Sequence, residues 1–130
     1  MGEERVEGRV LVVDDDPELR RLTARVLTKA GYEVLTAESG AAALERLAQG
    51  SFNAVVSDIL MPDMDGVTLL RNVRDLDLDI PVILMTGSPD LGTAVKAVEY
   101  GALRYIAKPA GAETLRDTIN QQPALLTVSV

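Results

Sequence analysis

Short unbroken runs of aliphatic residues alternate along the chain with segments whose apolar residues recur at helical spacing. The first run, residues 10–13, is typical of a strand buried on both faces, because no polar residue interrupts it. The next segment starts at Asp16 and Pro17, an N-cap residue followed by the residue favoured at the first helical position, and Gly31 ends it. We therefore assign Asp16 to helix capping, and expect strands and helices to follow one another in turn.

Continued along the chain, this alternation predicts five strands and five helices in a single domain. Strands are expected at residues 10–13, 33–37, 53–57, 82–85 and 103–106. Helices are expected at residues 17–30, 40–49 after a Ser39 cap, after Gly66 over about 67–73, around 94–98 up to Gly101, and over about 112–121. Short connections between buried strands predict an α/β fold with a parallel sheet and helices on both faces. Ligands of such sheets bind at the carboxyl ends of the strands.

Charged and polar residues follow four of the predicted strands at that end. Asp14 and Asp15 follow the first strand, Asp58 the third, Thr86 the fourth and Lys108 the fifth. Carboxylates placed close together raise one another's pKa unless a cation neutralises them. Hard oxygen ligands without His or Cys suit Mg²⁺ or Mn²⁺, so the three acids predict a metal site.

Asp58 is the candidate nucleophile of this site. A carboxylate held at the end of a rigid strand beside a metal can attack phosphorus and form an acyl phosphate. Lys108 and Thr86 are placed to hold the other oxygens of a phosphoryl group, and Gly87 lets backbone and ligand approach closely. The turn after Asp58 contains Pro and Gly, and its bend lets the carbonyl of Leu60 face the cation.

Taken in order, the motifs resemble a known family. VVDDDP at residues 12–17, SDILMPDMDG at 57–66, MTG at 85–87 and YIAKP at 105–109 resemble the receiver (response-regulator, CheY-like) domain of two-component signal transduction. The resemblance covers residues 9–121 and implies a flavodoxin-like fold with a five-stranded parallel sheet in the order 2-1-3-4-5. It leaves residues 1–8 as an N-terminal tail and 122–130 as a C-terminal tail or the start of a linker.

The resemblance also implies a role for each site residue. Asp58 accepts the phosphoryl group, and Thr86 and Lys108 contact it. Tyr105 resembles the aromatic switch residue that turns inward as Thr86 moves toward the phosphoryl group. The ligands implied for Mg²⁺ are Asp15, Asp58 and the backbone carbonyl of Leu60, with Asp14 assisting.

The partners that the resemblance implies are a sensor histidine kinase or phosphotransfer protein upstream and an output domain or protein downstream. The face expected to switch comprises the fourth helix, fifth strand and fifth helix, over residues 90–121. A second copy of the chain, bound through this face as a homodimer, is a further candidate partner. The chain is then expected not to be an enzyme, beyond catalysing its own phosphorylation and dephosphorylation.

Composition excludes several other functions. The formal net charge of −7 argues against direct nucleic acid binding. The chain has no Cys and no His, so thiol catalysis, disulfides and a phosphohistidine of its own are excluded. No apolar stretch has the length of a membrane helix and the acidic start does not resemble a signal peptide, which predicts a cytoplasmic domain that does not bind membranes.

Two alternative functions are open at this point. One is an interaction module that uses the receiver fold without phosphate, against which the intact acid set argues. The other is a Mg²⁺-dependent phosphatase of the haloacid dehalogenase type, whose Asp nucleophile follows the first strand in an Asp-x-Asp-x-Thr/Val pattern. Here Glu18 stands at the Thr/Val position, and no paired acids follow Lys108.

Overall fold

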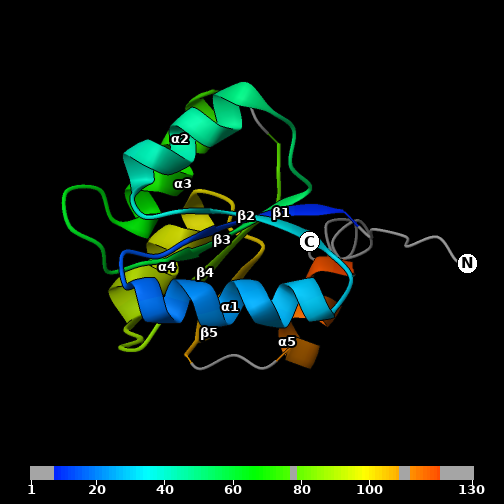
Figure 1. Ribbon diagram of the computed structural model, residues 1–130. Helices are drawn as coiled ribbons and strands as arrows, with labels where there is room; N and C mark the ends of the chain where they lie inside the picture. The colour runs from blue at the N-terminus through cyan, green and yellow to red at the C-terminus, as the bar shows by residue number, and fades with distance from the viewer. Residues whose placement is uncertain (1–7, 77–78, 109–111, 121–130) are drawn as a thin grey trace, which may run out of the picture.

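Five parallel strands form one sheet with helices packed on both of its faces (Figure 1). The computed structural model describes residues 8–76, 79–108 and 112–120. The two expected tails, apart from Gly8, lie outside these residues. The elements in chain order are β1 (Arg9–Val13), α1 (Pro17–Lys29), β2 (Glu33–Ala37), α2 (Gly40–Gln49), β3 (Ala54–Asp58), α3 (Gly66–Asp75), β4 (Val82–Thr86), α4 (Leu91–Glu99), β5 (Arg104–Ala107) and α5 (Ala112–Asn120).

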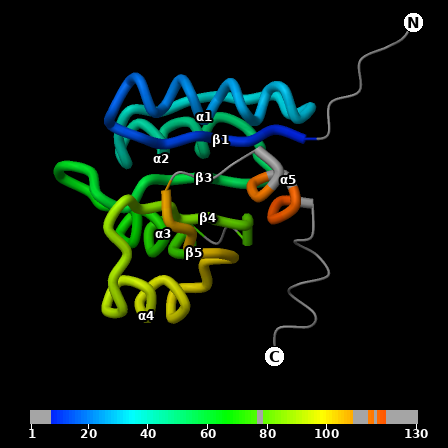
Figure 2. The backbone as a smooth tube through the Cα atoms, turned by 90° about the horizontal axis from the view of Figure 1, so that it is seen from below, coloured from blue at the N-terminus to red at the C-terminus, as the bar shows by residue number. Residues whose placement is uncertain are grey.

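The strand order is β2-β1-β3-β4-β5, which confirms the predicted fold and topology. Figure 2 labels four of these strands, β1, β3, β4 and β5. β1, β3 and β4 are the inner strands, and all but one of their residues are buried. A strand with helices on both faces has no solvated side, which is why these three segments read as unbroken aliphatic runs. The sheet therefore holds the residues at its carboxyl end on a rigid base.

Each face of the sheet packs against its own set of helices. On one face Leu11, Val55 and Leu84 contact α2, α3 and α4. On the other face Val12 and Ile83 join the core formed with α1 and α5. Neighbouring residues of one strand thus enter different cores, as the alternation of side chains along a strand requires.

Local signals fix the helix ends. The Asp16 carboxylate accepts the N–H groups of Glu18 and Leu19 at 2.9 and 3.3 Å, which confirms its capping role. Ser39 caps α2 as expected, by accepting the Ala42 N–H at 3.1 Å. Asp65 and Asp90 cap α3 and α4 in the same way, although the sequence analysis did not single them out.

β3 ends one residue later than its apolar pattern indicates. Asp58 is its last residue and pairs with Met85 of β4. The bonding continues beyond it, since the Ile59 N–H donates to the Met85 carbonyl at 2.9 Å. Asp58 therefore belongs to the strand, and backbone pairing rather than loop structure fixes its position. Among the described residues, no helix has the length and apolar character needed to cross a membrane.

Candidate functional site

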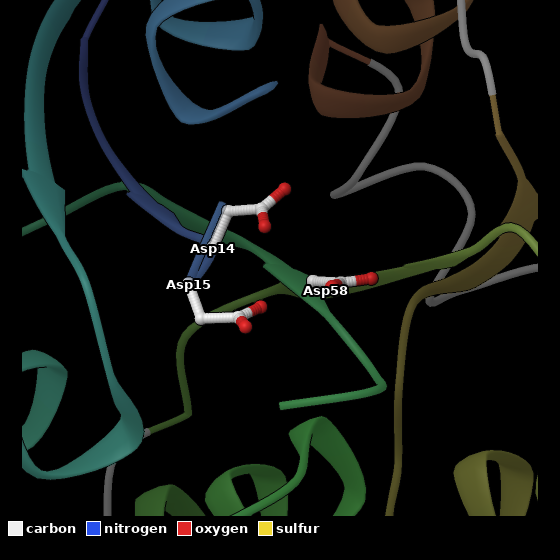
Figure 3. A group of neighbouring side chains, drawn as sticks. All are labelled: Asp14, Asp15 and Asp58. Atoms are coloured by element: carbon white, nitrogen blue, oxygen red, sulfur yellow. The ribbon is translucent and has the colours of Figure 1, made fainter. Parts of the chain in front are cut away.

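Three carboxylates converge at the carboxyl end of the sheet, where β1 and β3 end. Asp14, Asp15 and Asp58 each offer a carboxylate oxygen, and these atoms all lie within 4.8 Å of one another. Figure 3 shows Asp14 and Asp15 at the end of β1, with carboxylates directed to the same side as that of Asp58. Asp14 is 2% and Asp58 7% exposed, whereas Asp15 is open to solvent. The acids that the sequence analysis expects to meet are therefore neighbours, with two buried members and one open one.

Asp14 is bonded at each of its polar atoms. Its N–H donates to the Ala37 carbonyl at 3.2 Å, and its own carbonyl accepts from Arg20 Nη1 at 2.8 Å. Its Oδ1 accepts the Asp16 N–H at 3.0 Å, and its Oδ2 accepts from Lys108 Nζ at 3.3 Å. Asp14 is consequently a fixed member of this acid cluster.

Asp15 differs from its neighbour, because its carboxylate accepts no hydrogen bond from the part of the chain that the structure describes. It is free to turn toward a ligand without losing an internal contact. Asp16, the next residue, directs its carboxylate to the amides of α1 instead. The three consecutive acids thus have three different surroundings.

Lys108 is the cation of the pocket. Its Nζ lies 3.0 Å from Asp58 Oδ1 and 3.3 Å from Asp14 Oδ2. Burial raises the pKa of Asp58 above 3.8; Lys108 acts in the opposite direction, and the charges of Asp14 and Asp15 add to the increase. Burial alone lowers the pKa of Lys108, but its hydrogen bonds and charge interactions with Asp58 and Asp14 leave that pKa above 10.5. One ammonium therefore faces three carboxylates, an excess of negative charge that a further cation would reduce.

The donor set fits a hard divalent cation. It consists of carboxylate oxygens, which suit Mg²⁺ or Mn²⁺, and one of its members is exposed, which suits an ion that keeps several waters. Leu60 lies two residues after β3 with its side chain exposed, and the role of its carbonyl as a ligand stays a prediction.

Thr86 is the last residue of β4 and is 2% exposed. Its Oγ1 accepts the Ser88 N–H at 3.0 Å, and its carbonyl accepts the Lys108 N–H at 2.8 Å. The hydroxyl is thus bonded to the loop that leads to α4. Gly87 borders open space, because a Cβ placed there would meet no atom within 4 Å. No contact with the described residues requires a glycine at this position, and its expected role toward a ligand stays a prediction.

Tyr105 links β5 to the start of α4. It is half-buried, and its hydroxyl accepts the Asp90 N–H at 3.1 Å and donates to the Asp90 carbonyl at 3.3 Å. Asp90 is the N-cap of α4, so the expected switch residue is bonded to the residue that begins that helix. This link, like the Arg20 contact with Asp14, has no signal in the sequence pattern, because both depend on tertiary contacts.

Fold and pocket together define a flavodoxin-like α/β domain whose sheet ends in an acidic pocket with a single lysine. The chain belongs to the response regulator receiver domain family, whose sequence pattern it matches over residues 10–120. The resemblance inferred from the motifs is thereby confirmed.

Related proteins agree with this assignment. The chain is 44% identical to the DNA-binding transcriptional regulator NtrC of Escherichia coli K12, over 78% of this chain and 22% of that protein. It is 42% identical to the C4-dicarboxylate transport transcriptional regulatory protein DctD of Rhizobium meliloti, over 82% of this chain and 23% of that protein. The matched region therefore spans less than a quarter of the length of either regulator.

Solved structures share the fold. A response regulator receiver domain protein from Clostridium thermocellum superposes with a TM-score of 0.84 at 31% identity, covering 94% of this chain and 98% of that one.

Proposed function

We propose that this chain is a phospho-accepting receiver domain in which Asp58 takes a phosphoryl group from a sensor histidine kinase or a phosphotransfer protein. The observation that carries the proposal is the position of Asp58. Its carboxylate ends a buried strand, 3.0 Å from the Lys108 ammonium and beside the carboxylates of Asp14 and Asp15. Phosphoryl transfer depends on such positioning and charge neutralisation more than on covalent chemistry.

In the transfer step an Asp58 carboxylate oxygen forms a bond to phosphorus while the bond between phosphorus and the donor's imidazole nitrogen breaks. The electron pair of the broken bond stays on that nitrogen. Hydrolysis reverses the state of the domain: water attacks phosphorus, and Asp58 returns to a carboxylate as inorganic phosphate leaves. On this proposal the domain catalyses only its own phosphorylation and dephosphorylation.

The other residues hold charge during transfer. Asp14, Asp15, Asp58 and the Leu60 carbonyl would hold Mg²⁺ or Mn²⁺, which when bound supplies positive charge opposite the phosphoryl oxygens. Lys108 exchanges its contact with Asp58 Oδ1 for one with a phosphoryl oxygen. Thr86 turns its hydroxyl from the Ser88 N–H to another such oxygen.

The change that we propose for the output face starts at the Thr86 hydroxyl. When Thr86 releases Ser88, the loop before α4 loses a contact, and Tyr105 is bonded to the last residue of that loop, Asp90. The coupled change would bias α4, β5 and α5 between two arrangements, which an output domain, protein partner or second copy could then select. α4 carries apolar side chains exposed on this face: Leu91, Val95 and Val98.

The relatives suggest what kind of output to expect. NtrC and DctD are named as transcriptional regulators, and the matched region is under a quarter of each. We infer that this domain controls an output unit of that general kind. With a net charge of −7, the domain itself is poorly suited to contact nucleic acid.

Phosphorylation by acetyl phosphate with Mg²⁺, followed by borohydride trapping and mass spectrometry, tests the proposal. We expect a single modified residue, Asp58, and no modification of Asp58→Asn. Modification at Asp14 would favour the phosphatase alternative, and a parent protein that takes no phosphoryl group would favour the phosphate-independent module. Amide NMR with beryllofluoride then tests the output side, since shifts should extend beyond the acid cluster over residues 90–121.

A further inference from the structure

The peptide that joins Asp58 to Ile59 has close neighbours in β4, in Ser57 and at the start of α3. The Ile59 N–H donates to the Met85 carbonyl at 2.9 Å, which ties the peptide to β4. Pairing between β3 and β1 ends at Ser57 opposite Val13, so the Asp58 carbonyl lies one residue beyond that ladder. A different group must therefore satisfy this buried carbonyl.

Ser57 supplies that group. Its side chain is fully buried, and its hydroxyl donates to the Asp58 carbonyl oxygen at 2.9 Å. The bond joins neighbouring residues, so it fixes the orientation of the peptide plane directly after Asp58. In the sequence pattern Ser57 is only the last residue of a predicted strand.

Gly66 closes the other side of the same peptide. It is the first residue of α3, and its N–H donates to the Ile59 carbonyl at 2.8 Å. A Cβ at Gly66 would lie 2.5 Å from the Asp58 carbonyl oxygen and 2.9 Å from Ile59 Cα. Gly66 is not among the glycines with positive φ, so the position requires glycine for space rather than for backbone conformation.

We propose that Ser57 and Gly66 are positioning residues for the phosphoacceptor. Together they set the depth and the orientation of the Asp58–Ile59 peptide. That peptide determines where the Asp58 carboxylate stands relative to Lys108 and where the chain continues toward Leu60. The inference rests on the proposed function, in which both Asp58 and Leu60 face the cation. A displacement of about 1 Å at such a centre lowers a rate by about 100-fold.

Gly40 provides a matched control. It is also the first residue of a helix and is also buried, and a Cβ there would lie 2.5 Å from another atom. The three nearest atoms, however, all belong to the side chain of Met64: Sδ at 2.5 Å, Cγ at 2.9 Å and Cβ at 3.0 Å. Ala at position 40 can be accommodated by moving Met64, whereas Ala at position 66 has to displace the backbone of Asp58 or α3.

The experiment compares Gly66→Ala, Ser57→Ala and Gly40→Ala with the parent. Binding of Mg²⁺ alone is followed by amide NMR, and phosphorylation by acetyl phosphate gives the saturating rate and the half-saturating donor concentration. We expect Gly66→Ala to reduce the saturating rate by about 100-fold and to weaken Mg²⁺ binding. Ser57→Ala, which loses one buried hydrogen bond, should reduce the saturating rate and the Mg²⁺ affinity by about tenfold each. Gly40→Ala should keep a saturating rate and a Mg²⁺ affinity within about threefold of those of the parent.

Equal effects of Gly66→Ala and Gly40→Ala on the rate and on Mg²⁺ binding would overturn the inference, because the role of Gly66 would then be general packing. If Gly66→Ala does not fold, Ser57→Ala decides: parental Mg²⁺ affinity and rate in that variant contradict the inference. A parent that binds Mg²⁺ but accepts no phosphoryl group ends the proposed function, while the Mg²⁺ titrations still decide the roles of Ser57 and Gly66.

Discussion

The two ends of the sheet use charged side chains in opposite ways. At the amino end Arg74 donates from Nη1 to the Ile80 carbonyl at 2.9 Å and from Nη2 to the Gly101 carbonyl at 2.8 Å, so one guanidinium joins α3 to the chain before β4 and to the turn after α4. At the carboxyl end, Asp14 and Asp58 share the ammonium of Lys108, and Asp15 adds a third negative charge. At the amino end a cation meets neutral carbonyl groups, whereas at the carboxyl end three negative charges lie close together.

The pKa values of the two regions reflect this difference. Burial lowers the pKa of Arg74, and the charge of Asp79 opposes the decrease, so the guanidinium stays charged and bonded to carbonyls. Burial raises the pKa of Asp58, and neighbouring carboxylates raise it further. The amino end therefore holds a cation bonded to carbonyls, whereas the carboxyl end holds a carboxyl group, that of Asp58, in surroundings that disfavour its charged form. The comparison suggests that the acid pocket is shaped for a ligand rather than for stability.

The largest effect is expected from Lys108→Met, which removes the cation of the carboxyl end. The rate of phosphorylation by acetyl phosphate should fall by about 100-fold, because a positive group opposite the phosphoryl oxygens is lost. Mg²⁺ should bind more tightly, since Asp58 Oδ1 and Asp14 Oδ2 no longer have an internal partner. Rate assays and Mg²⁺ titration measure the two effects; an unchanged rate would remove Lys108 from the mechanism.

Arg74→Ala tests the amino end. The free energy of unfolding in urea should fall by about 2 kcal/mol, because charge-assisted bonds to two carbonyls are lost. Arg71→Ala is the control: Arg71 is exposed and lies 5.2 Å from the centre of the Tyr100 ring, so its loss should change stability by about 0.5 kcal/mol. Under conditions in which Arg74→Ala is folded, its phosphorylation rate should match the parent. A slower rate would show that the two ends are coupled.

Asp15→Asn and Asp16→Asn separate binding from capping within the acidic run. Mg²⁺ affinity should fall by roughly tenfold or more in Asp15→Asn, whose carboxylate has no competing contact with the described residues. It should hardly change in Asp16→Asn, because Asn is as good an N-cap as Asp. Isothermal titration with Mg²⁺ provides the measurement, and equal losses in both variants would contradict the assignment.

A smaller effect is expected from Tyr105→Phe, which removes the hydroxyl bonded to Asp90. Amide hydrogen exchange in the first turn of α4 should become faster, corresponding to about 1 kcal/mol of local stability. Tyr100→Phe is a suitable control, since the Tyr100 hydroxyl has no hydrogen-bond partner among the described residues. Unchanged exchange in α4 would mean that the link between Tyr105 and α4 has no influence on the helix.

The features that could be predicted from the sequence were those that residues close together in the chain determine. Unbroken aliphatic runs predicted the buried strands, and the Asp16-Pro17 pair predicted the start of α1 because capping involves residues two and three positions away. Carboxylates after separate parallel strands predicted a shared pocket, since such strands end at the same side of a sheet.

Apart from the bond between Ser57 and Asp58, the contacts missed from sequence join residues that are not neighbours in the chain. Gly66 looked like an ordinary turn glycine, and its contact with the Asp58 carbonyl exists only once α3 packs on β3. Arg74 was not singled out from the sequence, and its carbonyl partners lie 6 and 27 positions away. β3 was predicted to end one residue early, because its pairing with β4 continues where its apolar pattern stops.

The comparison between the two ends is tested most directly by the stability of Asp58→Asn against the parent, measured in urea at several pH values with and without Mg²⁺. Because the folded-state pKa of Asp58 is raised, ionisation of this carboxyl lowers stability as pH rises through that pKa. We therefore expect Asp58→Asn to be more stable than the parent at neutral pH without Mg²⁺. The difference should shrink below the raised pKa, where the parent is protonated, and also on adding Mg²⁺, which binds the folded parent. If Asp58→Asn is instead less stable than the parent at neutral pH without Mg²⁺, the carboxyl end does not hold an unfavourable excess of negative charge, and the central claim is wrong.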